Sequence, residues 1–166
     1  VALTLGAKIA SFTATDQDYA MKLLRQNITS NLTAVFPASK KGGKSKHKPK
    51  SANANSDRIK AEILDWEEDS VEQWQPVNLI IACDCIYNEA LVEPLNTTCA
   101  SICKLNTDPE KPTLCVVAQQ LRSPDVFEAW IKSFHRLFHT WQVPDRYLTE
   151  DLRENSGFVV HVGVVR

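Results

Sequence analysis

The 166-residue sequence lacks the features of membrane and secreted proteins. No apolar run approaches the roughly 18 residues of a membrane-spanning helix, and no secretory signal opens the chain. The five cysteines are odd in number, which fits reduced thiols better than a disulfide framework. We therefore expect a cytoplasmic protein, with the nucleus as the alternative location, and no membrane partner.

The sequence is also poor in glycine and in metal-binding patterns. Its five glycines form no Gly-x-Gly-x-Gly motif, and Gly42-Gly43 stands among lysines. The four histidines are scattered, and His161 is expected to be a hydrogen-bonded core residue. We predict no metal site, and we find no P-loop, zinc-finger or nucleophile-elbow motif.

Charge is distributed unevenly along the chain. Six lysines and no acids lie between Lys40 and Lys50, whereas the rest of the chain has 13 basic and 20 acidic residues, a net charge of about −7. Residues 37–56 are too polar to bury a core, so we predict a lysine-rich disordered insert there. The acidic remainder can attract a basic protein substrate and weakly repels nucleic acid.

The rest of the sequence alternates between strand and helix patterns. Strands are predicted at residues 10–16, 58–64, 77–83, 113–118, 141–148 and 158–165. Helices are predicted at residues 18–31, at 89–105 and after the opening Ser123-Pro124-Asp125. This alternation indicates an α/β fold with a mostly parallel sheet.

Two of the predicted strands end in an acid. The apolar strand at 77–83 is followed by Asp84, with Tyr87 three residues later, and the strand at 10–16 ends at Asp16. In open α/β sheets, ligands bind outside the carboxyl ends of the strands, so this pattern is typical of a nucleotide-type cofactor site. The alternative is that both acids cap the helices that follow them and that Tyr87 is a core residue.

These segments resemble the seven-stranded S-adenosylmethionine-dependent protein-lysine methyltransferases of family 16, and most of all the fungal ribosomal lysine methyltransferases. The matching segments are TATDQ at 13–17, LDW at 64–66, ACDCIY at 82–87 and GFVVHVGVVR at 157–166. The likeness covers nearly the whole chain apart from the insert. The acid-x-x-tyrosine motif combined with an upstream Asp-Trp pair makes the likeness fairly specific.

The resemblance implies a Rossmann-like sheet that binds S-adenosylmethionine. By that likeness Asp16 accepts hydrogen bonds from the ribose, Trp66 lies against the adenine, and the backbone of Cys83 faces the adenosyl group while its buried thiol is inert. Asp84 and Tyr87 orient the lysine amine for in-line displacement. The alternative for Trp66 is a half-buried surface residue.

The sequence departs from the family in one respect. Enzymes of this kind hold the methionine part of the cofactor with a glycine-rich loop after their first strand, and the sequence contains neither. We therefore expect residues 1–166 to form a partial methyltransferase domain that starts inside its first helix. We expect this fragment to be inactive alone.

The resemblance thus implies a protein-lysine N-methyltransferase that acts on a ribosomal or translation-related protein, for example one of the large subunit. The insert would add a weak contact to ribosomal RNA through phosphates. Two alternatives stay open, a dinucleotide-dependent Rossmann oxidoreductase and a non-catalytic methyltransferase-like interaction domain. The acceptor lysine and the number of methyl groups do not follow from the sequence.

Overall fold

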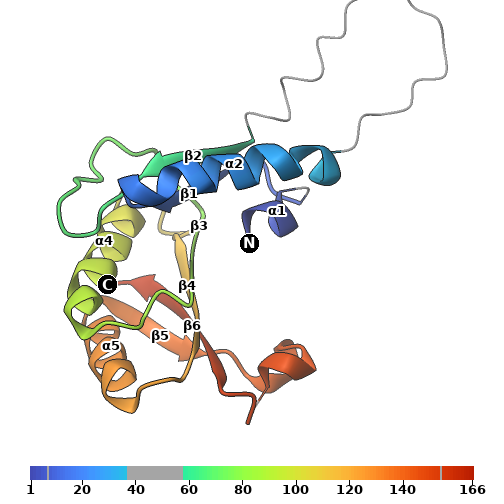
Figure 1. The fold of residues 1–166 in the computed structure, drawn as a ribbon. Helices are drawn as coiled ribbons and strands as arrows, with labels where there is room; N and C mark the ends of the chain where they lie inside the picture. Colours follow the sequence, from blue (N-terminus) through green and yellow to red (C-terminus); the bar gives the residue numbers. More distant parts are fainter. Residues whose placement is uncertain (7, 37–57, 154) are drawn as a thin grey trace, which may run out of the picture. The chain divides into compact units, whose positions relative to one another are not determined.

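The computed structural model describes residues 1–6, 8–36, 58–153 and 155–166 (Figure 1). They form two units, Val1–Asp65 and Trp66–Arg166. The lysine-rich insert predicted at 37–56 lies outside the described residues. None of the described helices is long and apolar enough to cross a membrane.

The first unit contains a two-stranded parallel sheet. β1 (Phe12–Asp16) pairs with β2 (Ile59–Ile63) in a register that places Asp16 opposite Ile63. Both strands lie where the sequence predicts them. Because the strands are parallel, their carboxyl ends meet at the same edge of the sheet.

Helices α1 (Ala2–Leu5) and α2 (Asp18–Val35) complete the first unit. α2 runs along the sheet (Figure 1), and its Met21 and Ile28 are buried together with Ile59 of β2. The predicted helix at 18–31 is therefore confirmed, and it continues for one further turn.

The second unit contains a four-stranded mixed sheet in the order β3-β4-β6-β5. The strands are β3 (Leu79–Cys83), β4 (Leu114–Gln120), β5 (Phe138–Gln142) and β6 (Phe158–Val165). β3 and β4 are parallel, but β6 is antiparallel to both of its neighbours. The prediction of a mostly parallel sheet is wrong for this unit, because β3 and β4 form its one parallel pair among the described residues.

Helices α4 (Val92–Lys104) and α5 (Pro124–Leu137) pack against this sheet and against each other (Figure 1). The short helix η1 (Glu89–Leu91) leads into α4. α5 begins as the sequence predicts, with Pro124 in its first turn, although the Ser123 side chain forms no capping hydrogen bond. The largest side chains buried between these elements include Trp130, Phe134, Phe138, Cys103 and Cys115.

The strand predicted at 141–148 is misplaced. β5 begins at Phe138, directly after α5, and the chain then forms the short helices η2 (Asp145–Tyr147) and η3 (Glu150–Leu152). Phe138 continues the apolar stripe of α5 and its ring stacks 4.3 Å from that of Phe134, so helical periodicity concealed the change to extended backbone. Pro144, which has no N–H to donate, follows the end of the strand.

The core of the second unit also contains polar side chains. His161 is buried, as predicted, with its ring 5.2 Å from that of Trp130. Burial, with a smaller contribution from His135, lowers the pKa of His161 to about 4. Within the described part of the chain, Nδ1 of His161, Nε1 of Trp130 and Nε2 of Gln119 have no hydrogen-bond partner. The prediction of a buried His161 is confirmed, whereas the prediction that it is hydrogen-bonded is wrong for Nδ1.

Candidate functional site

Asp84 is the first residue after β3, and its backbone turns sharply away from the sheet. Its φ of +54° lies in the left-handed region, which aspartate tolerates better than most residues. Its N–H donates a hydrogen bond of 2.7 Å to the carbonyl of Ala118 in β4. This turn places the carboxylate at the edge where β3 and β4 both end.

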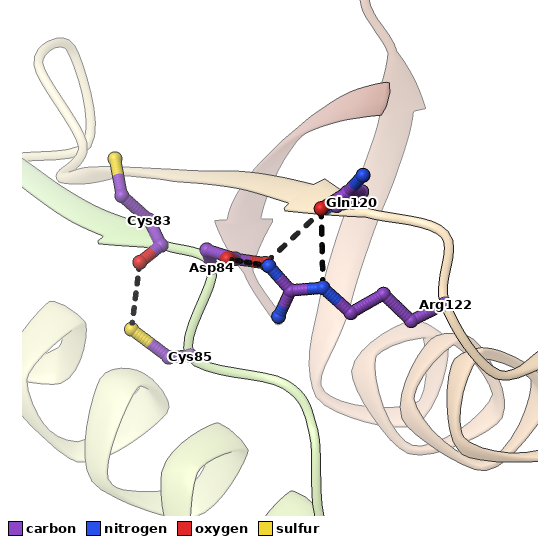
Figure 2. Close-up of polar contacts among 5 residues, drawn as sticks. All are labelled: Cys83, Asp84, Cys85, Gln120 and Arg122. Carbon is purple, nitrogen blue, oxygen red and sulfur yellow. Dashed lines mark hydrogen bonds and ion pairs between the residues drawn. The ribbon is translucent and has the colours of Figure 1, made fainter. Parts of the chain in front are cut away.

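Two residues at the end of β4 hold the Asp84 carboxylate (Figure 2). Nη2 of Arg122 lies 2.6 Å from Oδ2 of Asp84, and the backbone N–H of Gln120 donates to Oδ1 over 3.4 Å. The side chains of Arg122 and Asp84 are 55% and 41% exposed. Because an ion pair this exposed stabilises a fold by about 0–1 kcal/mol, the contact matters more for the direction of the carboxylate than for stability.

The structural alternatives for Asp84 and Tyr87 do not hold. The helix after β3 is capped by Asn88, whose Oδ1 accepts a 3.1 Å hydrogen bond from the N–H of Ala90. Asp84 is therefore not the cap. Tyr87 is 65% exposed, so it is not a core residue.

The cysteines differ sharply in their surroundings. Cys83 is exposed, so the expectation of a buried thiol is wrong there. Cys85 packs against the core and donates from Sγ to the Cys83 carbonyl, and burial raises its pKa to about 11. Cys99 and Cys103 are buried in the core as predicted, and burial raises the pKa of Cys103 to about 12. Among the described residues, no three His, Cys, Asp or Glu side chains are grouped so that they could hold a metal ion.

The first unit has its own acidic edge. Oδ1 of Asp16 accepts a 2.9 Å hydrogen bond from the Gln17 N–H, and Nε2 of Gln17 donates over 2.9 Å to Oδ2 of Asp65. The residue at the N-cap position of α2 is Gln17 rather than Asp16, so the capping alternative for Asp16 is wrong as well. Asp16 and Asp65 thus stand together where β1 and β2 end.

Trp66 is half-buried against the core of the second unit. Its carbonyl accepts a 3.3 Å hydrogen bond from Oγ1 of Thr98 in α4. Trp66 also lines a pocket of about 220 Å³, together with Val71 and the acids Asp69 and Glu72. An aromatic face beside hydrogen-bond acceptors can hold a flat heterocycle that carries an amino group.

A larger groove, of about 400 Å³, lies at the edge of the sheet where Asp84 stands. It is lined mainly by apolar side chains, among them Leu121, Leu148, Leu152 and Phe158. Leu121 follows the last residue of β4, and its N–H donates over 2.7 Å to the Gly157 carbonyl. This groove was not predicted, because residues from separate segments of the chain form it.

Four of the five predicted site residues belong to the second unit. Cys83 is the last residue of β3, Asp84 and Tyr87 follow it directly, and Trp66 lines its own pocket. Asp16 belongs to the first unit, so its binding of the same cofactor as the other four residues stays a prediction.

Sequence reasoning missed Gln120 and Arg122. Both lie at the carboxyl end of β4, next to the end of β3. The predicted strand at 113–118 ended two residues short of Gln120. A search for polar residues at the end of that strand would have found both.

An α/β sheet with helices packed against it and polar side chains at the carboxyl edge of its parallel strands is the arrangement of Rossmann-like ligand-binding domains. The structure is similar to a crystal structure described as the methyltransferase domain of bacterial CtHen1-CN, with a TM-score of 0.60 over 98% of this chain and 84% of that one. The two sequences are 11% identical, so this likeness concerns the fold.

The sequence identifies the family. A family model described as lysine methyltransferase matches residues 46–134, which is more than half of the chain. The chain therefore belongs to this methyltransferase family, and the matched segment includes Trp66, Cys83, Asp84, Tyr87 and Arg122. A search of curated proteins finds no match.

Proposed function

We propose that the protein transfers a methyl group from S-adenosylmethionine to a lysine side chain of another protein. The observation that carries this proposal is the exposed Asp84 carboxylate at the shared end of β3 and β4, with the exposed Tyr87 three residues later. Both residues lie within the segment that matches the lysine methyltransferase family. The two side chains offer an acceptor and a hydroxyl group to an incoming amine.

The residues present fit parts of the proposed cofactor. Trp66 would lie against the adenine in its pocket, the exposed carboxylate of Asp16 would accept hydrogen bonds from the ribose, and Cys83 would face the adenosyl group. When bound, the cofactor supplies an electrophilic methyl group on a sulfonium.

Asp84 and Tyr87 would act by positioning the amine. A lysine amine has a pKa of about 10.4 in water, and its lone pair becomes available only after it loses a proton. Hydrogen bonds from the amine to the Asp84 carboxylate and the Tyr87 oxygen would then aim that lone pair at the methyl group. Orientation of this kind accounts for a large part of the rate in two-substrate reactions.

The direct test measures transfer of labelled methyl groups from S-adenosylmethionine to ribosomal proteins by the protein. We expect Asp84→Asn and Tyr87→Phe to lower kcat/KM by about 10²-fold or more, because misplaced reactants cost about that much. Tyr147→Phe is the matched control, since Tyr147 is also exposed, at 71%. If the protein binds the cofactor but transfers no methyl group, the alternative of a non-catalytic interaction domain is favoured. If it reduces a nicotinamide cofactor instead, it is an oxidoreductase.

We further propose a ribosomal substrate, with the lysine-rich insert as a weak contact to RNA. The same assay on intact ribosomes tests this partner. Deletion of residues 40–50 should lower the rate and weaken its salt dependence, because lysine–phosphate contacts are strongly screened. An unchanged rate and salt dependence would contradict the RNA contact.

A further inference from the structure

We propose that Arg122 is a positioning residue that fixes the Asp84 carboxylate so that its Oδ1 receives the substrate amine. This inference rests on the proposed methyl transfer. Arg122 lies 38 residues beyond Asp84 in the sequence, and the structure brings the two side chains within 2.6 Å of each other (Figure 2).

The guanidinium of Arg122 is itself held in place. Its Nε donates a 3.1 Å hydrogen bond to Oε1 of Gln120, while its Nη2 contacts Oδ2 of Asp84. The arginine therefore bridges Gln120, the last residue of β4, and Asp84, the first residue after β3. A planar guanidinium with two fixed donors determines the plane of its partner more tightly than an ammonium group would.

The two carboxylate oxygens of Asp84 are held unequally. Oδ2 has a short, charge-assisted contact to Arg122, whereas Oδ1 has a 3.4 Å contact from the Gln120 N–H, which is long for a hydrogen bond. An ionised carboxylate has about four acceptor positions, so Oδ1 keeps capacity for a further donor. The amine of a substrate lysine is such a donor.

The backbone of Asp84 adds a second constraint from the same strand. Its N–H is bound to the Ala118 carbonyl, and its left-handed φ fixes the direction in which the side chain leaves the chain. Main chain and carboxylate are therefore both tied to β4. The ion pair carries no net charge, so an ammonium gains less from it than from a lone carboxylate, which favours the neutral amine that the reaction needs.

The test compares Arg122→Ala with wild type in the methyl-transfer assay. We expect kcat to fall by about 10–100-fold while the dissociation constant for S-adenosylhomocysteine stays within twofold, because a misaligned acceptor slows the reaction without affecting the cofactor. Added guanidinium ion should restore several-fold of the lost rate in Arg122→Ala, and Arg122→Lys should retain an intermediate rate. A change in folding alone would not respond to guanidinium in this way.

Arg136→Ala provides the matched control. Arg136 forms an exposed ion pair with Glu93 elsewhere in the same unit, with side chains 65% and 58% exposed, so its loss removes a comparable contact without touching Asp84. We expect this variant to keep the wild-type rate. If wild type transfers methyl groups and Arg122→Ala is equally fast or faster, the positioning role of Arg122 is wrong. If wild type transfers none, the proposed function fails and this inference fails with it.

Discussion

Cys83 provides a chemical probe of the proposed cofactor site. It is the exposed cysteine beside Asp84, whereas Cys85 is partly buried with a pKa raised to about 11, and the other three are buried. Alkylation requires an accessible thiolate, so iodoacetamide should modify Cys83 at least about tenfold faster than any other cysteine. Peptide mass spectrometry over a time course measures these rates.

S-adenosylhomocysteine should slow the alkylation of Cys83 if this residue faces the adenosyl group. Cys83→Ala should remove the fast phase and so identify it. If a saturating concentration of S-adenosylhomocysteine does not slow the alkylation of Cys83, the cofactor binds elsewhere.

At the scale of single elements, the sequence predicted most of the fold. Uninterrupted apolar runs marked the strands near Leu79–Cys83, Leu114–Gln120 and Phe158–Val165, since residues that pack against helices need no polar alternation. The direction of β6 was not predictable from such a run, because an apolar strand reads the same whether its neighbours are parallel or antiparallel. β5 was misplaced because Phe138 fits both the helix and the strand.

The candidate site was predicted unevenly for a similar reason. Asp84 and Tyr87 follow a strand directly, so their place at its carboxyl end could be read from local pattern. Arg122 is part of the site because it contacts Asp84, which lies 38 residues earlier in the sequence. A local sequence pattern does not contain a contact over that separation. The exposure of Cys83 was also missed, since apolar neighbours in sequence do not fix what covers a strand end.

Gly163 in β6 makes a testable close contact. A Cβ at this position would lie 2.7 Å from Cζ and 2.9 Å from Cε1 of the Phe134 ring, and 3.0 Å from Cβ of Phe138. Gly163→Ala should therefore reduce the free energy of unfolding by about 1–3 kcal/mol, as overpacked core substitutions do. Urea denaturation followed by circular dichroism measures the loss.

Gly157→Ala serves for comparison. A Cβ added there would have no neighbouring atom of the described residues within 4 Å, so the cost is the backbone strain of a φ of +78°. Combining Gly163→Ala with Phe134→Leu should cost less than the sum of the two single changes, since the ring that clashes is gone. If the two losses of unfolding free energy are strictly additive, the contact between the methyl group added by Gly163→Ala and the Phe134 ring is not the cause of the destabilisation.

At the scale of the whole molecule, the buried His161 links stability to pH. Its pKa is lowered to about 4 in the folded state, against about 6.5 when unfolded, so between these values the unfolded chain binds more protons than the folded one. The stability that the neutral, buried His161 contributes is fully present above pH 6.5. It is lost as the pH falls towards 4, and the free energy of unfolding decreases by up to about 1.4 kcal/mol for each pH unit.

Replacing His161 with leucine removes this proton and should flatten the dependence of unfolding free energy on pH between 4 and 6.5. The carboxylates contribute equally to both proteins, so the difference between the two curves isolates the histidine. Parallel curves for wild type and His161→Leu would show that His161 takes up no extra proton on unfolding.

The left-handed backbone at Asp84 affects how variants at this position should be interpreted. Asparagine and glycine adopt that conformation readily, whereas alanine or glutamate pays about 1–2 kcal/mol for it. In a saturation mutagenesis screen, many substitutions at position 84 would therefore lower activity through backbone strain as well as through loss of the carboxylate. Asparagine keeps the main-chain turn while removing the negative charge, so the Asp84→Asn phenotype is the one that reports on the carboxylate.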